Sequence, residues 1–561
     1  MDVSADTCAP SRLEVQWHDI DWVSAHRMVR RLQERIVKAT RESRWGKVKA
    51  LQYLLTHSLS AKAIAVRRVT ENTGKKTPGV DGVIWSLPAQ KTAALKMLKH
   101  RGYHPKPLRR IHIPKSNGKL RPLGIPTMRD RAMQALHLLA LDPIAETTAD
   151  PNSYGFRPGR STTDARAMVF RCLCSEDSAQ WVLEGDIKGC FDNISHDWML
   201  GNVPMNKQIL RKWLKCGFME QGAFFDTESG TPQGGIISPV LANMVLDGLE
   251  GRIHGKFPRK IRVNEPEISL KVNVVRYADD FIITARSKEL AERILPIVQD
   301  FIAERGLELS QEKTKITHID QGFDFLGWNV RKYDGTLLIK PAKKNVKNFL
   351  DKVRGIIKAS KTATAEWMID KLNPVISGWS RYHRNAVASQ TFNRADNEIW
   401  KCLWRWALRR HSNKRRPWIK DKYFARIGER NWVFNTGEVA GGKNTQGDRK
   451  VLKQAVEVKI DHHYVKVQAE ANFYDPAWDK YFGKRITARM EQTVAGLKRI
   501  AALWSRQEGR CLTCGELITE ETGWHVHHVF GRLVPNANAL SKLQLLHPNC
   551  HMQTHFRKTL S

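Results

Sequence analysis

Apolar residues recur at helical spacing in the first part of the chain, from about residue 24 to residue 71. Val29, Leu32 and Ile36 share one helix face, and arginine and lysine occupy the others. Apolar positions three and four apart predict amphipathic helices. A segment rich in glycine and proline at 77–82 follows and predicts a loop.

Shorter apolar runs, separated by turn residues, dominate from about 109 to 326. Two of them, at 272–275 and 281–283, flank four residues and predict a hairpin. The run at 181–183 predicts a strand that leads into a turn, and the run at 240–249 predicts a helix. This irregular mixture is typical of an α+β domain.

Helical periodicity returns after a hairpin predicted at Asp334-Gly335. In the segment 400–409 the apolar residues, Trp400 and Trp404 among them, form one face of a helix. We expect these tryptophans to pack in a core rather than stack on bases, because their spacing already serves helix burial. Residues 435–447 lack apolar periodicity and predict a flexible insertion or a domain boundary.

The chain is strongly basic. It carries 92 lysines and arginines against 57 aspartates and glutamates, a net charge of +35. A surplus spread along the whole chain indicates a polyanionic partner such as RNA or DNA, since each neutralised phosphate releases condensed counterions. No stretch reaches the roughly 18 apolar residues of a spanning helix, and we find no signal peptide or lipid anchor motif. We therefore expect no membrane association and a location in the cytoplasm.

Carboxylates gather at the predicted hairpin. Its turn reads Tyr277, Ala278, Asp279 and Asp280, and Asp186 lies at the end of another predicted strand. Adjacent carboxylates on a rigid turn offer hard oxygen ligands to divalent ions such as Mg²⁺. The three aspartates predict a two-metal nucleotidyl transferase, although an isolated Asp-Asp turn would equally suit a solvated surface hairpin.

A second group of metal-binding residues lies further along the chain. Cys511 and Cys514 form a C-x2-C pair, and His547 and Cys550 form an H-x2-C pair. This ligand set predicts a closed structural Zn²⁺ site. The remaining cysteines are scattered, which indicates reduced thiols rather than a disulfide framework.

Several blocks resemble, in content and in order, the reverse transcriptases encoded by group II introns. The blocks are Ile111–Lys115, Arg121–Pro126, Ser153–Arg160, the Asp186 segment, the Pro-Gln-Gly loop at Gly230–Pro239, the Asp279-Asp280 pair and Phe323–Trp328. The resemblance implies a multidomain α+β fold with right-hand polymerase fingers and palm, an α-helical thumb called domain X, and a C-terminal zinc-stapled ββα-metal module of the HNH type. The implied domains are a basic helical extension at 1–82, fingers and palm at 83–330, the thumb at 331–430, a DNA-binding segment at 431–505 and the HNH module at 506–561.

The resemblance also implies the metal ligands of the polymerase. Asp186 and Asp279 would bind two Mg²⁺ ions, and Asp280 would support them. Phosphoryl transfer needs positioning and charge stabilisation more than covalent chemistry, and two ions held by carboxylates supply both.

Four further residues would contact the incoming nucleotide. Lys115 and Arg121 would bind its triphosphate, the alternative being two solvated charges in a basic turn. Phe191 would lie against the sugar and exclude a 2′ hydroxyl. Gln233 would touch the nascent base pair, where neighbouring glycines permit close backbone approach.

Histidines around the zinc pattern suggest a second catalytic site. His551 and His555 are four apart on one helix face and could hold a divalent metal with His527, while His528 activates water as a general base. This arrangement resembles the HNH endonuclease fused to many group II intron proteins, except that Lys542 replaces the family's middle asparagine.

The departure at Lys542 leaves alternatives open. Asn536 or Asn538 could compensate if the loop is re-registered, and Lys542 could contact the scissile phosphate. The module could instead be a zinc-stapled DNA-binding knob without nuclease activity.

Together these features predict a group II intron reverse transcriptase and RNA-splicing maturase that supports intron mobility by nicking target DNA and by target-primed cDNA synthesis. Its expected partners are intron RNA, double-stranded target DNA and dNTPs, in a bacterial cytoplasm or at the nucleoid. One alternative is a splicing factor with a vestigial polymerase, against which the three aspartates argue. Another is a free-standing reverse transcriptase with a non-nucleolytic zinc tail.

Overall fold

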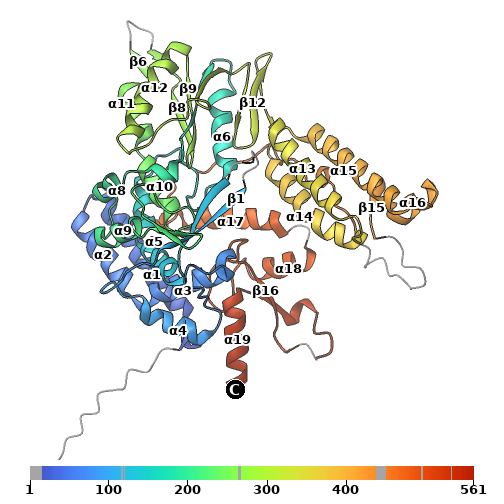
Figure 1. Cartoon of the computed structure of the whole chain (residues 1–561), viewed down its shortest axis with the longest axis horizontal. Helices are drawn as coiled ribbons and strands as arrows, with labels where there is room; N and C mark the ends of the chain where they lie inside the picture. Colours follow the sequence, from blue (N-terminus) through green and yellow to red (C-terminus); the bar gives the residue numbers. More distant parts are fainter. Residues whose placement is uncertain are drawn as a thin grey trace, which may run out of the picture.

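The structure is a computed structural model that describes residues 16–114, 118, 120–258, 260–262, 267–436, 450–494, 497–531 and 534–560. In Figure 1 the first helices lie at one side, the palm strands lie above them, and the thumb helices extend to the other side. No described helix is long and apolar enough to cross a membrane.

The helices predicted at the start of the chain are confirmed. They are α1 (Trp22–Arg41), α2 (Trp45–His57) and α3 (Leu59–Glu71), preceded by the 3-10 turn η1 (Trp17–Asp19) and followed by η2 (Thr73–Lys76) and α4 (Pro88–Met97). Asp21 caps α1 and Ser58 caps α3, each accepting a backbone N–H with its side chain. The apolar faces of α1, α2 and α3 pack against the largely buried α5 (Met128–Thr148).

A four-stranded sheet in the order β2-β1-β4-β5 lies in the segment that we expect to form the fingers and palm, and we call it the fingers sheet. Its strands are β1 (Leu108–Pro114), β2 (Leu120–Ile125), β4 (Phe218–Glu220) and β5 (Ala223–Phe225). β1 and β2 form an antiparallel hairpin, and β4 joins β1 in parallel. The sheet places the β1–β2 hairpin near the loop at 230–235.

The palm sheet has the order β10-β3-β9-β8 and is covered on both faces. Its strands are β3 (Trp181–Asp186), β8 (Asn273–Tyr277), β9 (Asp280–Ala285) and β10 (Lys315–His318). Leu183 and Ile283 belong to the core that contains α12 (Lys288–Ala303), while Val182 and Ile282 belong to the core that contains α6 (Thr162–Leu173). Successive strand residues point to opposite faces, so both faces are buried.

Shorter elements connect the fingers and the palm. They are α7 (Cys190–Asn193), α8 (His196–Asn202), α9 (Lys207–Leu214), α10 (Ser238–Leu246), α11 (Leu249–Lys256), β6 (Lys260–Arg262) and β7 (Glu267–Ser269). The helix predicted from Val240 to Leu249 is therefore divided, because α10 ends at Leu246 and Gly248 takes a left-handed conformation before α11.

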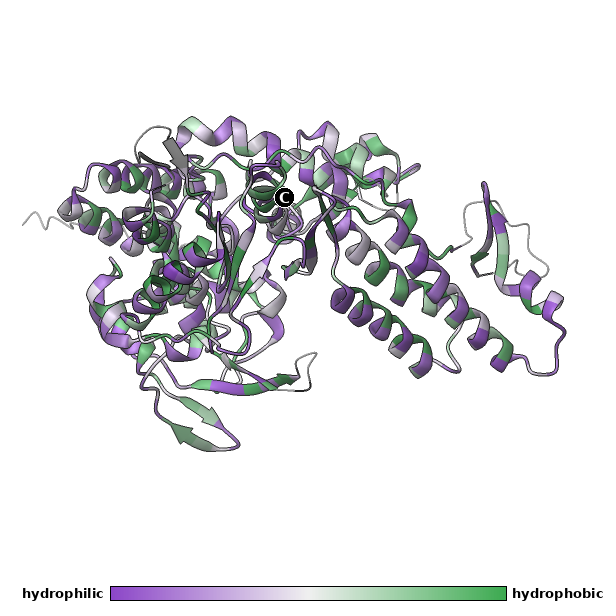
Figure 2. Ribbon diagram, turned by 90° about the horizontal axis from the view of Figure 1, so that it is seen from above, coloured by the Kyte–Doolittle hydropathy of each residue, from purple (hydrophilic) through white to green (hydrophobic). Residues whose placement is uncertain are grey.

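The thumb has its own core. A small sheet precedes it, with β11 (Phe323–Phe325), β12 (Trp328–Tyr333) and β13 (Thr336–Pro341), and the hairpin predicted at Asp334-Gly335 joins the last two. The thumb elements are α13 (Lys343–Ala359), α14 (Ala365–His383), α15 (Ser389–Arg410), α16 (Arg416–Tyr423), β14 (Phe424–Ile427) and β15 (Arg430–Phe434). Figure 2 shows these helices extending away from the rest of the chain.

After the thumb the chain returns to the palm. The insertion predicted at 435–447 lies almost wholly outside the described residues. Val467 then donates its N–H to Asp164 of α6 at 2.7 Å, and Arg160 donates to the Ala471 carbonyl at 2.9 Å. The remaining elements are η3 (Ala455–Glu457), η4 (Pro476–Trp478), α17 (Asp479–Val494), α18 (Lys498–Arg506), β16 (His525–His528), η5 (Leu540–Lys542), β17 (Leu543–Leu546) and α19 (Pro548–Leu560), and α19 packs on α3 and η1.

Candidate active site and metal centres

The palm sheet brings the three aspartates together where its two central strands, β3 and β9, end and begin. β8 and β9 pair through Tyr277 and Asp280, so Ala278 and Asp279 form the turn predicted from the sequence. Ala278 has a φ of +58°, which this tight turn requires. On the other side of β9, Asp280 lies opposite Asp186 in the antiparallel register. The sheet thus brings together carboxylates that are far apart in the sequence.

Burial and neighbouring like charges raise the pKa values of two of these carboxylates, Asp280 and Asp279. Burial, followed by the neighbouring Asp279 and Asp186, raises the pKa of Asp280 to about 6. Burial also raises the pKa of Asp279, and Asp186 adds to the effect. A divalent cation would relieve the repulsion and favour the ionised forms, so this donor set fits hard metal ions.

Lys313 is a neighbour of the site that the sequence analysis did not identify. Its Nζ lies 2.8 Å from Asp186 Oδ2, and the Lys313 side chain is 65% exposed while that of Asp186 is 29% exposed. The contact depends on the segment before β10, where Ser310 donates its N–H to the Asp186 carbonyl at 2.8 Å. No sequence motif marks this lysine, because its position follows from the pairing of β10 with β3.

The block Ser153–Arg160 supports the aspartate turn from behind. Tyr154 donates its N–H to the Arg276 carbonyl at 2.9 Å, and a Cβ on Gly155 would lie 2.4 Å from the Ala278 nitrogen. The side chain of Arg276 is buried, pairs with Asp247 and donates to the Ala278 carbonyl. These contacts explain why a glycine and a buried arginine lie beside the turn.

The Pro-Gln-Gly loop joins the fingers to the palm. Arg121 Nε donates to Gln233 Oε1 at 2.7 Å, and the Gly124 N–H donates to the Gln233 carbonyl, also at 2.7 Å. At the other end of the loop, Thr231 donates its N–H to the carbonyl of Phe191, whose side chain is 8% exposed. The structure therefore links Arg121, Gln233 and Phe191 through one loop, whereas Lys115 lies outside the described residues.

Two clusters of metal-binding residues lie in the last described part of the chain. The ligand atoms of Cys511, Cys514, His547 and Cys550 all lie within 4.8 Å of one another, and all four residues are buried. His547 directs Nδ1 at Cys514 Sγ, 3.2 Å away, while its Nε2 contacts the Leu517 carbonyl at 3.2 Å. This buried set is compatible with zinc.

The second cluster contains His527, His551 and His555, and their ligand atoms also lie within 4.8 Å of one another. His551 and His555 lie on one face of α19, as their spacing predicted, and their Nε2 atoms are 3.2 Å apart. His528 lies next to the cluster on β16, and its Nε2 is 3.2 Å from Asn538 Oδ1.

The described residues between β16 and β17 form two specific side-chain contacts. Lys542 Nζ donates to the Pro535 carbonyl at 2.7 Å, and Asn536 adopts a left-handed φ of +54°. The loop thereby brings Asn538 to His528. Lys542 is therefore bonded to its own loop, and Asn538 lies at hydrogen-bond distance from His528.

Family comparisons agree with the geometry. Residues 113–330 match the reverse transcriptase (RNA-dependent DNA polymerase) family, 17–98 match the N-terminal domain of reverse transcriptase, and 346–424 match the group II intron maturase-specific domain.

Two bacterial relatives are similar to this chain over about half of its length. Protein YkfC of Escherichia coli is 36% identical over 299 residues, which are 47% of this chain and 78% of YkfC. Group II intron-encoded protein LtrA of Lactococcus lactis is 32% identical over 392 residues, 58% of this chain and 65% of LtrA, so the match spans slightly less than two thirds of LtrA. A solved telomerase structure from Candida albicans aligns with 56% of this chain and 66% of its own chain, at 11% identity. The TM-score of 0.32 is too low to equate the two folds. From its domains and relatives, the chain belongs to the group II intron-encoded reverse transcriptases and maturases.

Proposed function

We propose that the palm site polymerises DNA on an RNA template, with Asp186 and Asp279 holding two Mg²⁺ ions and Asp280 supporting them. The observation that supports this role is the meeting of three carboxylates at one end of the central strands β3 and β9, with raised pKa values at Asp279 and Asp280. When bound, the ions lower the barrier to attack by the primer 3′ oxygen and stabilise the leaving pyrophosphate.

The residues around the Pro-Gln-Gly loop orient the nucleotide. Arg121 supplies positive charge for the triphosphate, and Lys115 has the same proposed role. Gln233, which is hydrogen-bonded to Arg121 and Gly124, would contact the nascent base pair. Phe191 supplies the ring that excludes a 2′ hydroxyl, and its carbonyl is fixed by the same loop.

Primer extension tests the assignment. Asp279→Ala should lower extension of a DNA primer on an RNA template by several orders of magnitude, because water alone does not replace a metal ligand. Asp300→Ala, on the exposed surface of α12, serves as the matched control and should retain activity. Extension by Asp279→Ala within about tenfold of wild type would refute the role of Asp279.

The maturase function should be separable from polymerisation. Intron RNA is the proposed partner of the basic surface and the thumb, neither of which requires the palm metals. Asp279→Ala should therefore still promote splicing of the intron in the same preparation that fails to extend a primer. If this variant loses splicing while charge-reducing surface variants splice normally, the proposed division of roles is wrong.

A second function, nicking of target DNA by an HNH module, is favoured by the contact between His528 and Asn538. In the tautomer that donates Nε2–H to Asn538 Oδ1, the Nδ1 lone pair of His528 is available to take a proton from water. The water oxygen forms a bond to phosphorus as the bond to the 3′ oxygen breaks, and the leaving 3′ oxygen takes a proton from the solvent. His527, His551 and His555 would hold the divalent metal that stabilises the phosphate charge.

Nicking of target DNA tests this second function. His528→Ala should abolish nicking while zinc content and DNA affinity remain those of wild type. If the wild-type protein binds target DNA and zinc but does not nick at any divalent metal concentration, the module binds DNA without cleaving it.

A further inference from the structure

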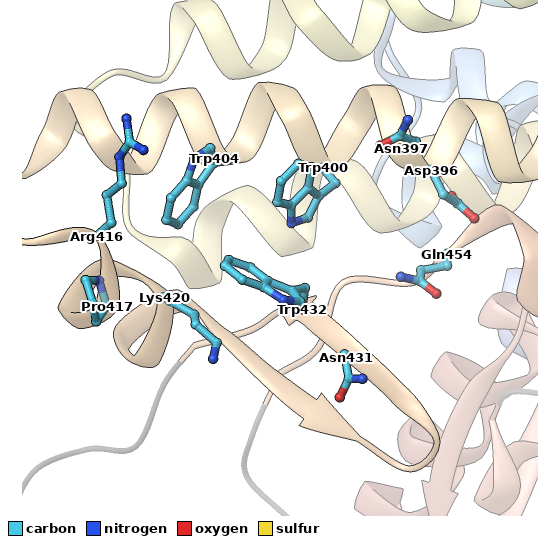
Figure 3. Close-up of a pocket in the computed structure, with 10 residues that line it drawn as sticks. All are labelled: Asp396, Asn397, Trp400, Trp404, Arg416, Pro417, Lys420, Asn431, Trp432 and Gln454. Carbon is cyan, nitrogen blue, oxygen red and sulfur yellow. The ribbon is translucent and has the colours of Figure 1, made fainter.

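Three tryptophans surround a pocket in the thumb, between α15 and the β14–β15 hairpin (Figure 3). The rings of Trp400 and Trp404 are nearly parallel, with centroids 6.3 Å apart and an interplanar angle of 6°. Trp432 lies nearly perpendicular to both, at 5.8 and 5.5 Å. The pocket has a volume of about 760 Å³, which is ample for a nucleotide.

The α15 residues divide between the core and this pocket. Leu403 and Ala407 are fully buried in the thumb core, whereas Trp400 and Trp404 are half-buried and line the pocket. We expected these tryptophans to pack in a core; they pack against the thumb core and also line the pocket. Trp400 Nε1 has no hydrogen-bond partner among the described residues.

The rim of the pocket combines cations with amides. Arg416 and Lys420 lie at one end, and Lys420 Nζ is 5.3 Å from the centre of the Trp432 ring. Neither cation forms an ion pair with an acidic residue in the described part of the chain. Asp396, the acidic residue in the lining, already accepts the N–H groups of Ala455 and Val456.

Amide side chains of Asn397, Asn431 and Gln454 occupy the other end. Asn397 and Asn431 are exposed. Aromatic faces bind nucleobases, amides read base edges, and unpaired cations bind phosphate. Aromatic rings alone would also suit an apolar peptide, but the two uncompensated cations favour an anionic occupant.

We propose that this pocket binds an unpaired nucleotide of single-stranded RNA, with its base against Trp432 and its phosphate at Arg416 and Lys420. The choice of RNA over DNA rests on the proposed maturase function, since both polymers offer bases and phosphates. The pocket lies outside the palm and takes no part in the polymerase chemistry.

Binding of an unstructured, fluorescently labelled RNA 12-mer to the full chain tests the proposal. Trp432→Ala should weaken binding by about fivefold to a hundredfold, the usual loss for one stacked base. Trp418→Ala is the matched control, because Trp418 is 40% exposed against 38% for Trp432 but does not line the pocket. This control should bind within about twofold of wild type, and Trp432→Phe should recover most of the affinity.

Two further measurements complete the test. Thermal melting verifies that each variant folds, and primer extension at saturating template should stay at the wild-type level, so failure of the polymerase proposal is seen separately. Unchanged RNA affinity in a folded Trp432→Ala variant would overturn the proposal. Tighter binding of the matching DNA 12-mer, or of an acidic peptide, than of the RNA would overturn it as well.

Discussion

Gly185 shows how one missing side chain shapes the polymerase site. It precedes Asp186 in β3 and pairs with Phe281 of β9. A Cβ at Gly185 would lie 2.1 Å from Cζ of the buried Phe281 ring. The ring therefore packs directly over the backbone that positions Asp186, and no residue with a side chain leaves room for it.

Gly185→Ala should lower the free energy of unfolding by about 1–3 kcal/mol, because the ring or the strand must shift. Primer extension should fall as well, since Asp186 is the next residue. Gly201→Ala, at a helical position of α8 with nothing within 4 Å, is the control and should be neutral or stabilising by up to about 1 kcal/mol. Chemical denaturation of both variants measures the difference, and equal stabilities would contradict the packing argument.

Lys542 gives a second prediction at this scale. Lys542→Asn introduces the asparagine that the proposed HNH module would be expected to carry, but it removes the bond to the Pro535 carbonyl. We expect this variant to nick target DNA more slowly, because the loop no longer holds Asn538 at His528. Asn538→Ala should be slower still, and Lys542→Arg should retain most of the rate. Nicking by Lys542→Asn at or above the wild-type rate would show that Asn538 does not position His528.

The sequence predicted the aspartates and the histidine clusters but not their partners. Motif and spacing predicted that Asp186 and Asp279 come together and that Cys511, Cys514, His547 and Cys550 form a cluster, since metal-binding chemistry demands those residue types. Lys313 and Asn538 reach their sites through strand pairing and loop shape. Such contacts depend on tertiary geometry, which local patterns do not encode.

Among the elements, α19 makes the most consequential contacts. The backbone N–H of Asn549 donates to the carboxylate of Glu71 on α3 at 2.9 Å. The side-chain Oδ1 of Asn549 accepts the indole N–H of Trp17 at 2.8 Å. Arg67, also on α3, is buried, pairs with Glu71 and lies 3.6 Å from Cys550 Sγ. The buried cluster of cysteines and His547 is thus packed against the first helices rather than in an isolated module.

Metal removal should therefore loosen α3 as well as the cluster itself. A strong chelator should increase amide hydrogen exchange in η1, α3 and α19 by at least about tenfold, because a structural zinc site contributes folding free energy. The thumb helix α15, which has a separate core, is the internal control and should keep its protection. Unchanged exchange in α3 after complete zinc loss would show that the two regions are stable independently.

The elements themselves were largely predictable. Periodic segments such as 24–71 and the hairpins at 277–280 and 334–335 follow from local patterns and turn chemistry. The two uses of the tryptophans on α15 were not predictable, because the same spacing serves a core and a pocket. The β14–β15 hairpin, which carries Trp432, packs beside α15, so that Trp400 and Trp404 line the pocket between them.

For the whole molecule, the charge of +35 predicts a strong salt dependence. Affinity for intron RNA should fall by roughly a thousandfold between about 50 and 200 mM salt, as expected when several phosphates are neutralised. Binding isotherms at a series of salt concentrations give the slope. A decrease of less than about tenfold would indicate that few phosphates are contacted.

The contact between Trp17 and Asn549 can form only after almost the whole chain has been synthesised. These residues are 532 positions apart, and a ribosome adds about 5–20 residues per second. Roughly half a minute to two minutes therefore pass between the synthesis of η1 and that of α19. During this interval the palm and thumb can fold, while the faces of η1 and α3 that receive α19 stay uncovered. The nascent chain thus completes its first domain only after its last one has been translated.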